Sequence, residues 1–235
     1  MTIEHYLNHI GGQLRGDGQV LRHSISAQTN ERLPYAFHQA ALEKIEAAVL
    51  AAEAAYLDFR STSPAQRAEF LDATEKELDT LDDDFFRCVM SETALPEARI
   101  HRERARTSNQ LRLFAGVVRR GDLLGARIGR ALAQRTLQPR PDLRQYRMGI
   151  GPVAVFGASN FPLAFSTAGG DTPSTLAAGC PVVVKAHCWH MLTAAHVACA
   201  IDRAVTASGV PQGVFHMITV PALARDWSSI QLSGV

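Results

Sequence analysis

The side chain of Asn160 is the first group in this sequence whose type and position suggest catalysis. It lies in the segment FGASNFPLAFSTAGGD (residues 156–171), between a short apolar run and a Phe-Pro pair that opens an alanine-rich stretch. One interpretation is structural, because Asn is a favoured helix N-cap whose side-chain oxygen accepts a free backbone N–H. The other is chemical: the amide N–H₂ could donate to a developing oxyanion, and removing such a donor typically costs about 100- to 1000-fold in rate. The two interpretations use opposite ends of the amide, so one residue could serve both.

A second group of chemically capable side chains follows the apolar run PVVVK. Lys185 ends this run, and the tetrapeptide HCWH (residues 187–190) comes directly after it. A cation at the end of a buried parallel strand lies where α/β sheets bind nucleotides, although such a lysine can also cap the sheet and extend to water. His187, Cys188 and His190 carry metal-binding atoms, but they are too close together on one loop to converge on zinc. We therefore predict no metal site.

The four cysteines show no C-x-x-C pair. Their spacing argues against a metal knuckle or a disulfide framework and is typical of a reducing, cytoplasmic setting. Cys180 and Cys199 are expected to be buried by packing, the usual state of a free cysteine, and Cys88 lies on a predicted helix. Cys188 is expected to be exposed near the site but far from Asn160, so we do not assign it as a nucleophile.

Composition limits the class of partner. The 235 residues include 24 Lys plus Arg and 23 Asp plus Glu, a net charge of +1. No global field would therefore attract nucleic acid or an anionic membrane. The N-terminus lacks the apolar core of a signal peptide, and no apolar run approaches the roughly 18 residues of a membrane span. We expect a cytoplasmic protein whose partner is a small molecule.

The elements that would position these side chains follow from changes in the hydrophobic pattern. Residues 1–37 are mixed, with a Gly-rich hairpin in NHIGGQLRGDG and an extended edge segment in NERLPYAF. Residues 38–118 have a helical period, with Pro64 in a first turn and Gly121 after the last helix. Residues 122–150 are predicted to be extended strands and connections, with the following side chains spaced as buried anchors: Leu132, Leu137, Leu143 and Tyr146.

After Gly151 short apolar runs alternate with helical patterns. Strands are predicted near 152–156, 181–185 and 214–218, with helices at 161–178 and 192–208. Continuous apolar strands separated by helices indicate parallel pairing with right-handed crossovers, which is half of a doubly wound nucleotide-binding sheet. A sheet that stops at the third strand would leave an open edge.

The segment GPVAVFGASNFPLAFSTAGGDTPSTLAAGCPVVVKAH strongly resembles the aldehyde dehydrogenase family. It is most similar to the branch with NADP-linked fatty aldehyde and α-ketoglutaric semialdehyde (2,5-dioxovalerate) dehydrogenases. NHIGG, SETALPEARI, RERARTSNQLRLFAGVVRRGD and QPRPDLR extend the resemblance from about residue 7 to 218. It implies an α/β fold, the N-terminal half of an aldehyde dehydrogenase, with a helical layer and a partial Rossmann-like parallel sheet. The implied parts are residues 1–121 as the helical part of the cofactor-binding domain, 122–150 as an oligomerisation-type segment, 151–218 as a βαβαβ half-sheet, and 219–235 as a tail unlike the family.

The resemblance also implies roles for single residues. Asn160 matches the family's oxyanion-stabilising Asn, and Lys185 matches the Lys that bonds the adenosine ribose hydroxyls. Cys188 falls where this branch often carries a small hydroxyl residue that admits the 2′-phosphate of NADP. The implied cofactor is NADP or NAD, and its binding residues are Phe156, Gly157, Ala158, Ser159, Lys185, His187 and Cys188.

The family's catalytic Cys and Glu lie in G-Q-x-C and E-L-G-G motifs, which this sequence does not contain. We therefore expect a chain truncated before both groups and inactive on its own. Its implied function is to oxidise a small aldehyde, for example a semialdehyde, to the acid with NAD(P). The alternative is an inactive remnant that binds nucleotide weakly or associates with a full-length homologue. Homo-oligomers through residues 122–150 are a further expectation from the resemblance.

Overall fold

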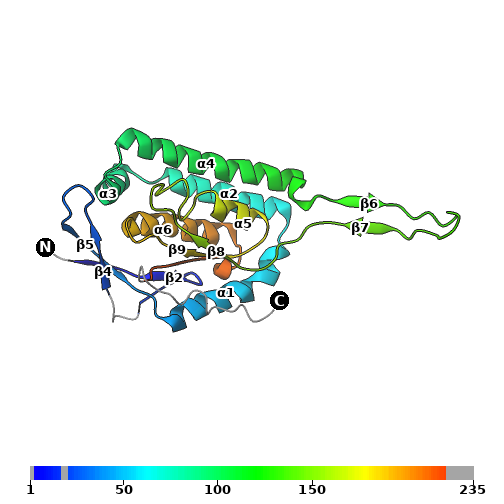
Figure 1. Ribbon diagram of the computed structural model, residues 1–235, viewed down its shortest axis with the longest axis horizontal. Coiled ribbons are helices and arrows are strands. Elements are labelled where there is room, and N and C mark those ends of the chain that lie inside the picture. The colour runs from blue at the N-terminus through cyan, green and yellow to red at the C-terminus, as the bar shows by residue number, and fades with distance from the viewer. Residues whose placement is uncertain (1–2, 17–20, 221–235) are drawn as a thin grey trace.

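The structure is a computed structural model that describes residues 3–16 and 21–220. Its centre is a five-stranded sheet with the strand order β3-β2-β10-β9-β8 (Figure 1). Three of these strands, β8 (Val153–Phe156), β9 (Val182–Lys185) and β10 (Phe215–Ile218), are parallel to one another. The parallel half-sheet predicted from the alternating pattern is therefore confirmed.

An N-terminal hairpin covers the side of β10 that faces away from β9. β2 (Asn8–Ile10) pairs antiparallel with β10, and β3 (Gln13–Arg15) pairs antiparallel with β2. Gly11 and Gly12 form the turn between β2 and β3 with φ of 60° and 72°, a conformation that favours glycine. The three parallel strands were expected to leave an open edge; residues from the start of the chain fill the position beside β10, and β8 remains at the other edge of the sheet.

A second, three-stranded sheet has the order β1-β5-β4. β1 (Glu4–Tyr6) runs parallel to β5 (Arg32–His38), and β4 (Leu21–Ile25) is antiparallel to β5 on its other side. The segment NERLPYAF, expected at a sheet edge, is thus the central strand. Pro34 is tolerated there because it falls where the register between β4 and β5 shifts, a usual position for proline in sheets.

Four helices follow, as predicted for residues 38–118. They are α1 (Leu42–Arg60), α2 (Pro64–Asp79), α3 (Asp83–Thr93) and α4 (Glu97–Arg120). The Ser63 side chain caps α2 by accepting a hydrogen bond from Gln66 N, with Pro64 at the first helical position. α4 ends at Gly121, whose φ is 73°. None of the helices in the described part of the chain has the length and apolar character needed to cross a membrane.

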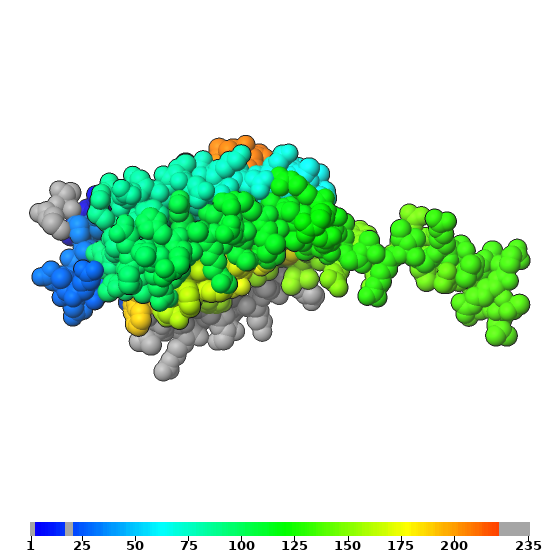
Figure 2. Space-filling view, turned by 90° about the horizontal axis from the view of Figure 1, so that it is seen from above, coloured from blue at the N-terminus to red at the C-terminus, as the bar shows by residue number. Residues whose placement is uncertain are grey.

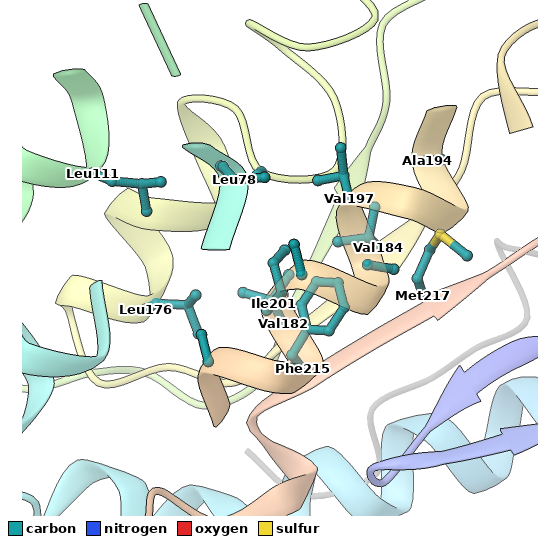
Figure 3. Close-up of a cluster of buried hydrophobic side chains, with 14 of the residues drawn as sticks. Leu78, Leu111, Leu176, Val182, Val184, Ala194, Val197, Ile201, Phe215 and Met217 are labelled. Carbon is teal, nitrogen blue, oxygen red and sulfur yellow. The ribbon is translucent and has the colours of Figure 1, made fainter. Parts of the chain in front are cut away.

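Helices pack against both faces of the five-stranded sheet. On one face lie α5 (Asp171–Ala177) and α6 (Met191–Ser208), and a short 3₁₀ turn, η2 (Gln212–Val214), leads into β10. α2 packs on α6 and α4 packs on α2, whereas α1 lies against the other face (Figure 1). The side chains of β9 alternate accordingly. Val182 and Val184 enter the main core with Phe215 and Ile201 (Figure 3), whereas Val183 joins a second cluster with residues of α1.

Residues 122–150 form a hairpin that projects from the body of the molecule (Figures 1 and 2). A 3₁₀ turn, η1 (Asp122–Leu124), precedes β6 (Arg127–Gly129), which pairs antiparallel with β7 (Leu143–Gln145). The extended conformation predicted for this segment is confirmed, but the predicted burial of its anchors is wrong. The exposed fractions are 46% for Leu132, 106% for Leu137, 54% for Leu143 and 59% for Tyr146. A two-stranded ribbon that projects from the core offers no second layer to bury these side chains.

Candidate functional site

The predicted site residues gather where β8 and β9 end. Gly157 N, directly after β8, donates a hydrogen bond to Lys185 O, the last residue of β9, at 3.1 Å. A Cβ at position 157 would lie 2.9 Å from Ser166 Oγ and 3.3 Å from His187 N. Only a residue without a side chain therefore lets these three segments meet, which explains the glycine at position 157.

The segment after Asn160 is a series of turns. Phe165 N donates to Phe161 O, Ala158 N donates to Phe165 O, and the first regular helix, α5, begins ten residues later than predicted, at Asp171. The expected helix over residues 161–178 is therefore wrong in its first half. The N-cap interpretation of Asn160 is wrong for the same reason, because no helix starts there. The Asn160 side chain is exposed.

Helix α4 holds the loop that carries Asn160. Arg99 Nη2 donates to Asn160 O at 2.7 Å, and Arg99 Nε donates to Glu103 Oε1 at 3.0 Å. Glu103 Oε2 accepts from the backbone N–H groups of Leu163 and Ala164, each at 3.3 Å. Thr107 Oγ1 donates to Leu163 O at 3.0 Å.

Residues 99, 103 and 107 are spaced four apart, so they form one stripe along α4. This α4 brace (Arg99, Glu103 and Thr107) holds the backbone of the loop, and the Asn160 residue remains exposed. The brace was not predicted, although the four-residue spacing is visible in RERART and the residues before it.

A buried histidine holds the other side of the same loop. His190 Nε2 lies 2.8 Å from Ala158 O and donates to it, since a carbonyl can only accept. His190 is fully buried, its Nδ1 has no hydrogen-bond partner among the described residues, and burial is the main reason its pKa is lowered. The ring is therefore neutral, and sequence reasoning missed its positioning role.

The carboxyl end of β9 carries a positive charge on Lys185. Burial is the largest cause of the lowered pKa of Lys185, and among the described residues no carboxylate pairs with its ammonium group. Burial, followed by the charges of His190 and Lys185, lowers the pKa of His187 to about 4. The His187 and His190 rings lie 5.2 Å apart in a stacked arrangement. His187 is therefore neutral at pH 7, and Lys185 is the ionised group at this edge.

Asn160 and Cys188 line one cavity of about 540 Å³, together with Ser159, Trp189 and Arg22. Cys188 was expected to lie far from Asn160, whereas both residues line this cavity. Phe156 is 55% exposed at the end of the edge strand β8.

The remaining cysteines differ in exposure. Cys180 is buried, as expected, and Cys88 is half-buried. The expected burial of Cys199 is wrong, because its position on α6 faces outward. Among the described residues no group of three or more His, Cys, Asp or Glu side chains is placed to hold a metal ion.

The family model of the aldehyde dehydrogenase family matches residues 19–225. The chain is 52% identical over 195 residues to alpha-ketoglutaric semialdehyde dehydrogenase of Acinetobacter baylyi, covering 83% of this chain and 37% of the relative. It is 51% identical over 185 residues to alpha-ketoglutaric semialdehyde dehydrogenase 2 of Azospirillum brasilense, covering 79% and 35%. The chain thus spans little more than a third of the length of these relatives.

Solved structures show the same fold. Aldehyde dehydrogenase 21 of Physcomitrella patens superposes with a TM-score of 0.82 at 18% identity, over 99% of this chain and 46% of that one. An NADP-dependent enzyme of E. coli superposes with a TM-score of 0.80 at 23% identity, over 94% and 43%. With the matched family model and the two close relatives, these likenesses establish that the chain belongs to the aldehyde dehydrogenase family.

Proposed function

We propose that this chain supplies the oxyanion donor and the nucleotide-binding edge of an enzyme that oxidises a semialdehyde to the acid with NAD or NADP. The observation that carries the proposal is the exposed Asn160 amide, held on a braced loop at the carboxyl edge of a parallel sheet. Two relatives at 51–52% identity bear the name alpha-ketoglutaric semialdehyde dehydrogenase, which supports the substrate class.

Asn160 would act by donating its amide N–H to the oxygen of the reacting carbonyl. Negative charge grows on that oxygen when a nucleophile adds, so a donor already fixed in place stabilises the transition state more than the substrate. The α4 brace supports this role, because Arg99 holds the Asn160 carbonyl while the side chain stays free. The donor only stabilises charge that a nucleophile creates, and the G-Q-x-C and E-L-G-G motifs are absent from this sequence.

The residues at the edge fit a nicotinamide nucleotide. Lys185 offers an ammonium group that no carboxylate of the described residues neutralises, at the crevice where such sheets bind nucleotides. Gly157 to Ser159 would lie along the ribose, with Phe156, His187 and Cys188 beside them. The nucleotide, when bound, accepts a hydride from the substrate carbon. Neither charge nor shape at this edge separates NAD from NADP.

Carboxylate recognition would come from Arg22. Its guanidinium lines the cavity shared with Asn160 and forms no ion pair with any described residue. The acidic residue in the same cavity, Glu92, is already engaged by four hydrogen bonds from Ser24, Leu192 and Thr193. A free guanidinium beside the oxyanion donor suits an aldehyde whose far end is a carboxylate.

A second role as an oligomer subunit is favoured by the projecting hairpin. Its exposed apolar side chains include Ile128 and Leu143, at 67% and 54% exposure, on a ribbon that lacks a second layer. We propose that residues 122–150 pair with a second copy of this chain or with a longer homologue. We also place the protein in the cytoplasm. An Ile128→Glu, Leu143→Glu double variant should lower the mass measured by light scattering to that of a monomer. An unchanged oligomer in this variant would exclude the hairpin as its interface.

The nucleotide site is tested by calorimetric titration of NADP and NAD into the wild type, Lys185→Met and the control Lys76→Met. Lys76 is exposed on α2, so its loss removes the same charge away from the sheet edge. Lys185→Met should weaken binding about tenfold or more, as expected for a charge-assisted hydrogen bond. Equal affinities for all three proteins would remove Lys185 from the site, and no binding to the wild type would contradict the nucleotide edge itself.

A further inference from the structure

A second cavity, of about 480 Å³, lies at the base of the projecting hairpin. Arg60, Arg67 and Arg147 all line it. Its wall includes Gly149, which precedes β8, whereas Asn160 follows β8. The cavity therefore lies at the opposite end of that strand from the candidate functional site, and the proposed function leaves it without a role.

Arg67 is the most enclosed of the three arginines. Its Nη1 donates to Ala177 O at 3.3 Å and its Nη2 to Thr62 O at 3.4 Å, both long bonds. Its Nε is buried and has no hydrogen-bond partner among the described residues. Burial is the main cause of the lowered pKa of this guanidinium. A buried cation with an unused donor is costly, and an anion in the cavity would relieve that cost.

The three arginines also lack counter-charges within the part of the chain that the structure describes. On α4, by contrast, Arg104, Arg112 and Arg119 each pair with a carboxylate. Among the described residues no carboxylate pairs with the arginines of this cavity, and none of those lining it is acidic.

Arg67 lies beside the C-terminal end of α1. A Cβ at Gly179 would lie 2.6 Å from Arg67 Nη1 and 3.5 Å from Arg60 Cα, which places the Arg67 guanidinium next to the backbone of Arg60. Three cationic side chains around one cavity, none of them paired with a described carboxylate, create a local field that attracts an anion.

The rest of the wall is largely apolar. Val118, Leu123, Leu124 and Met148 line the cavity, with the ring of Tyr146 beside them. The volume lies within the range of sites that enclose small organic molecules. A site with guanidinium groups and an apolar wall suits a ligand with an oxyanion at one end and hydrocarbon at the other.

We propose that this hairpin-base cavity binds a short aliphatic carboxylate. The planar guanidinium fork matches the two oxygens of a carboxylate, and the exposed side chain of Arg147 supplies such a fork at the cavity wall. The hydrocarbon part lies against the leucines and Met148. A bound carboxylate links the C-terminal end of α1, the start of α2 and the base of the hairpin, all of which contribute to the wall.

The experiment is calorimetric titration of hexanoate, sulfate and 1-hexanol into the full chain. Arg147→Gln removes one exposed guanidinium, while the bond from its backbone N–H to Leu124 O remains possible. Leu124→Glu places a competing carboxylate on the wall. Arg135→Gln, at an exposed position on the hairpin, is the matched control for loss of a charge. Circular dichroism checks that each variant is folded.

Hexanoate should bind the wild type and Arg135→Gln alike, bind Arg147→Gln about tenfold more weakly or worse, and not bind Leu124→Glu. Equal binding of hexanol would overturn the role of the arginines. Equal binding of sulfate would overturn the role of the apolar wall. The proposal is also overturned if Arg147→Gln binds hexanoate as tightly as Arg135→Gln, or if the wild type shows no binding up to about 10 mM.

Discussion

Replacing Glu103 with Gln should loosen the loop that carries Asn160. Glu103 is 5% exposed, accepts hydrogen bonds from Leu163 N and Ala164 N, and pairs with Arg99. Gln has nearly the same shape but is neutral, and one oxygen becomes an N–H₂ group that faces donors. The substitution therefore separates loss of charge from loss of volume.

The expected loss of stability in Glu103→Gln follows from the number of interactions that weaken. A hydrogen bond to a charged group contributes about 1.5–3 kcal/mol, and a buried donor left without a partner costs about 1–3 kcal/mol. The bonds to Leu163 N and Ala164 N are long at 3.3 Å, and Arg99 is partly solvated. We therefore expect the low end, a loss of about 2–4 kcal/mol in the free energy of unfolding. For a domain of this size that corresponds to a Tm lower by roughly 5–15 °C.

Urea unfolding followed by far-UV circular dichroism measures this loss. Glu53→Gln is the matched control, because Glu53 is exposed on α1 and its substitution should change stability by less than about 0.5 kcal/mol. Hydrogen exchange gives the local readout: the amides of Leu163 and Ala164 should exchange faster in Glu103→Gln by more than the global loss explains. If both variants unfold alike and these two amides stay equally protected, the brace does not hold the loop.

Three further outcomes are expected. The pKa of His9 is raised to about 9: burial alone would lower it, but the hydrogen bonds that His9 donates to Asp202 and Cys199 together outweigh burial. The stabilisation from His9 is complete below about pH 6.5 and is lost as the pH rises through 9, on the order of 3 kcal/mol, and chemical unfolding across this range should show no such loss in His9→Gln. Gly157→Ala should lower the free energy of unfolding, measured in urea, by about 1–3 kcal/mol, because the new Cβ would be too close to Ser166 Oγ. Part of this stability should return in a Gly157→Ala, Ser166→Ala double variant. With an aldehyde and NAD or NADP, the 235-residue chain should produce no reduced nicotinamide, as measured by absorbance. Turnover that disappears in Cys188→Ser would instead make Cys188 a nucleophile.

The local sequence pattern predicted correctly the elements that consist of short apolar runs. The runs VAVF and PVVVK predicted β8 and β9 to within a residue. Val182 to Val184 of β9 are buried, as a continuous apolar run indicates, whereas β8 is an edge strand that exposes Ala154 and Phe156. The predicted boundary of α4 at Gly121 is correct for a similarly local reason, the left-handed conformation of its cap.

Contacts between distant segments decided the rest. Residues 161–170 were expected to be helical, yet Glu103 of α4 accepts hydrogen bonds from the backbone amides of Leu163 and Ala164, some 60 positions away in the sequence. The leucines of the hairpin have the spacing of a buried strand, but whether a second layer covers them is a property of the assembly. The cover of β10 by the N-terminal hairpin is likewise a pairing between opposite ends of the chain.

The geometry of the candidate site depends on two buried carboxylates that lie outside the sheet. Glu103, on α4, accepts the backbone amides of the loop after β8. Glu92, on α3, accepts Leu192 N and Thr193 N at 2.9 and 2.8 Å, at the start of the helix that follows β9. In each case a carboxylate accepts hydrogen bonds from backbone N–H groups that a turn or the first turn of a helix leaves without a backbone partner. The negative charge of the carboxylate strengthens these bonds. The parallel strands bring Asn160 and Lys185 to the same edge, but the N-terminal helices set the conformation of the segments that carry and follow them. The half-sheet and the helical layer therefore form one structural unit, and the loop that carries Asn160 contacts both.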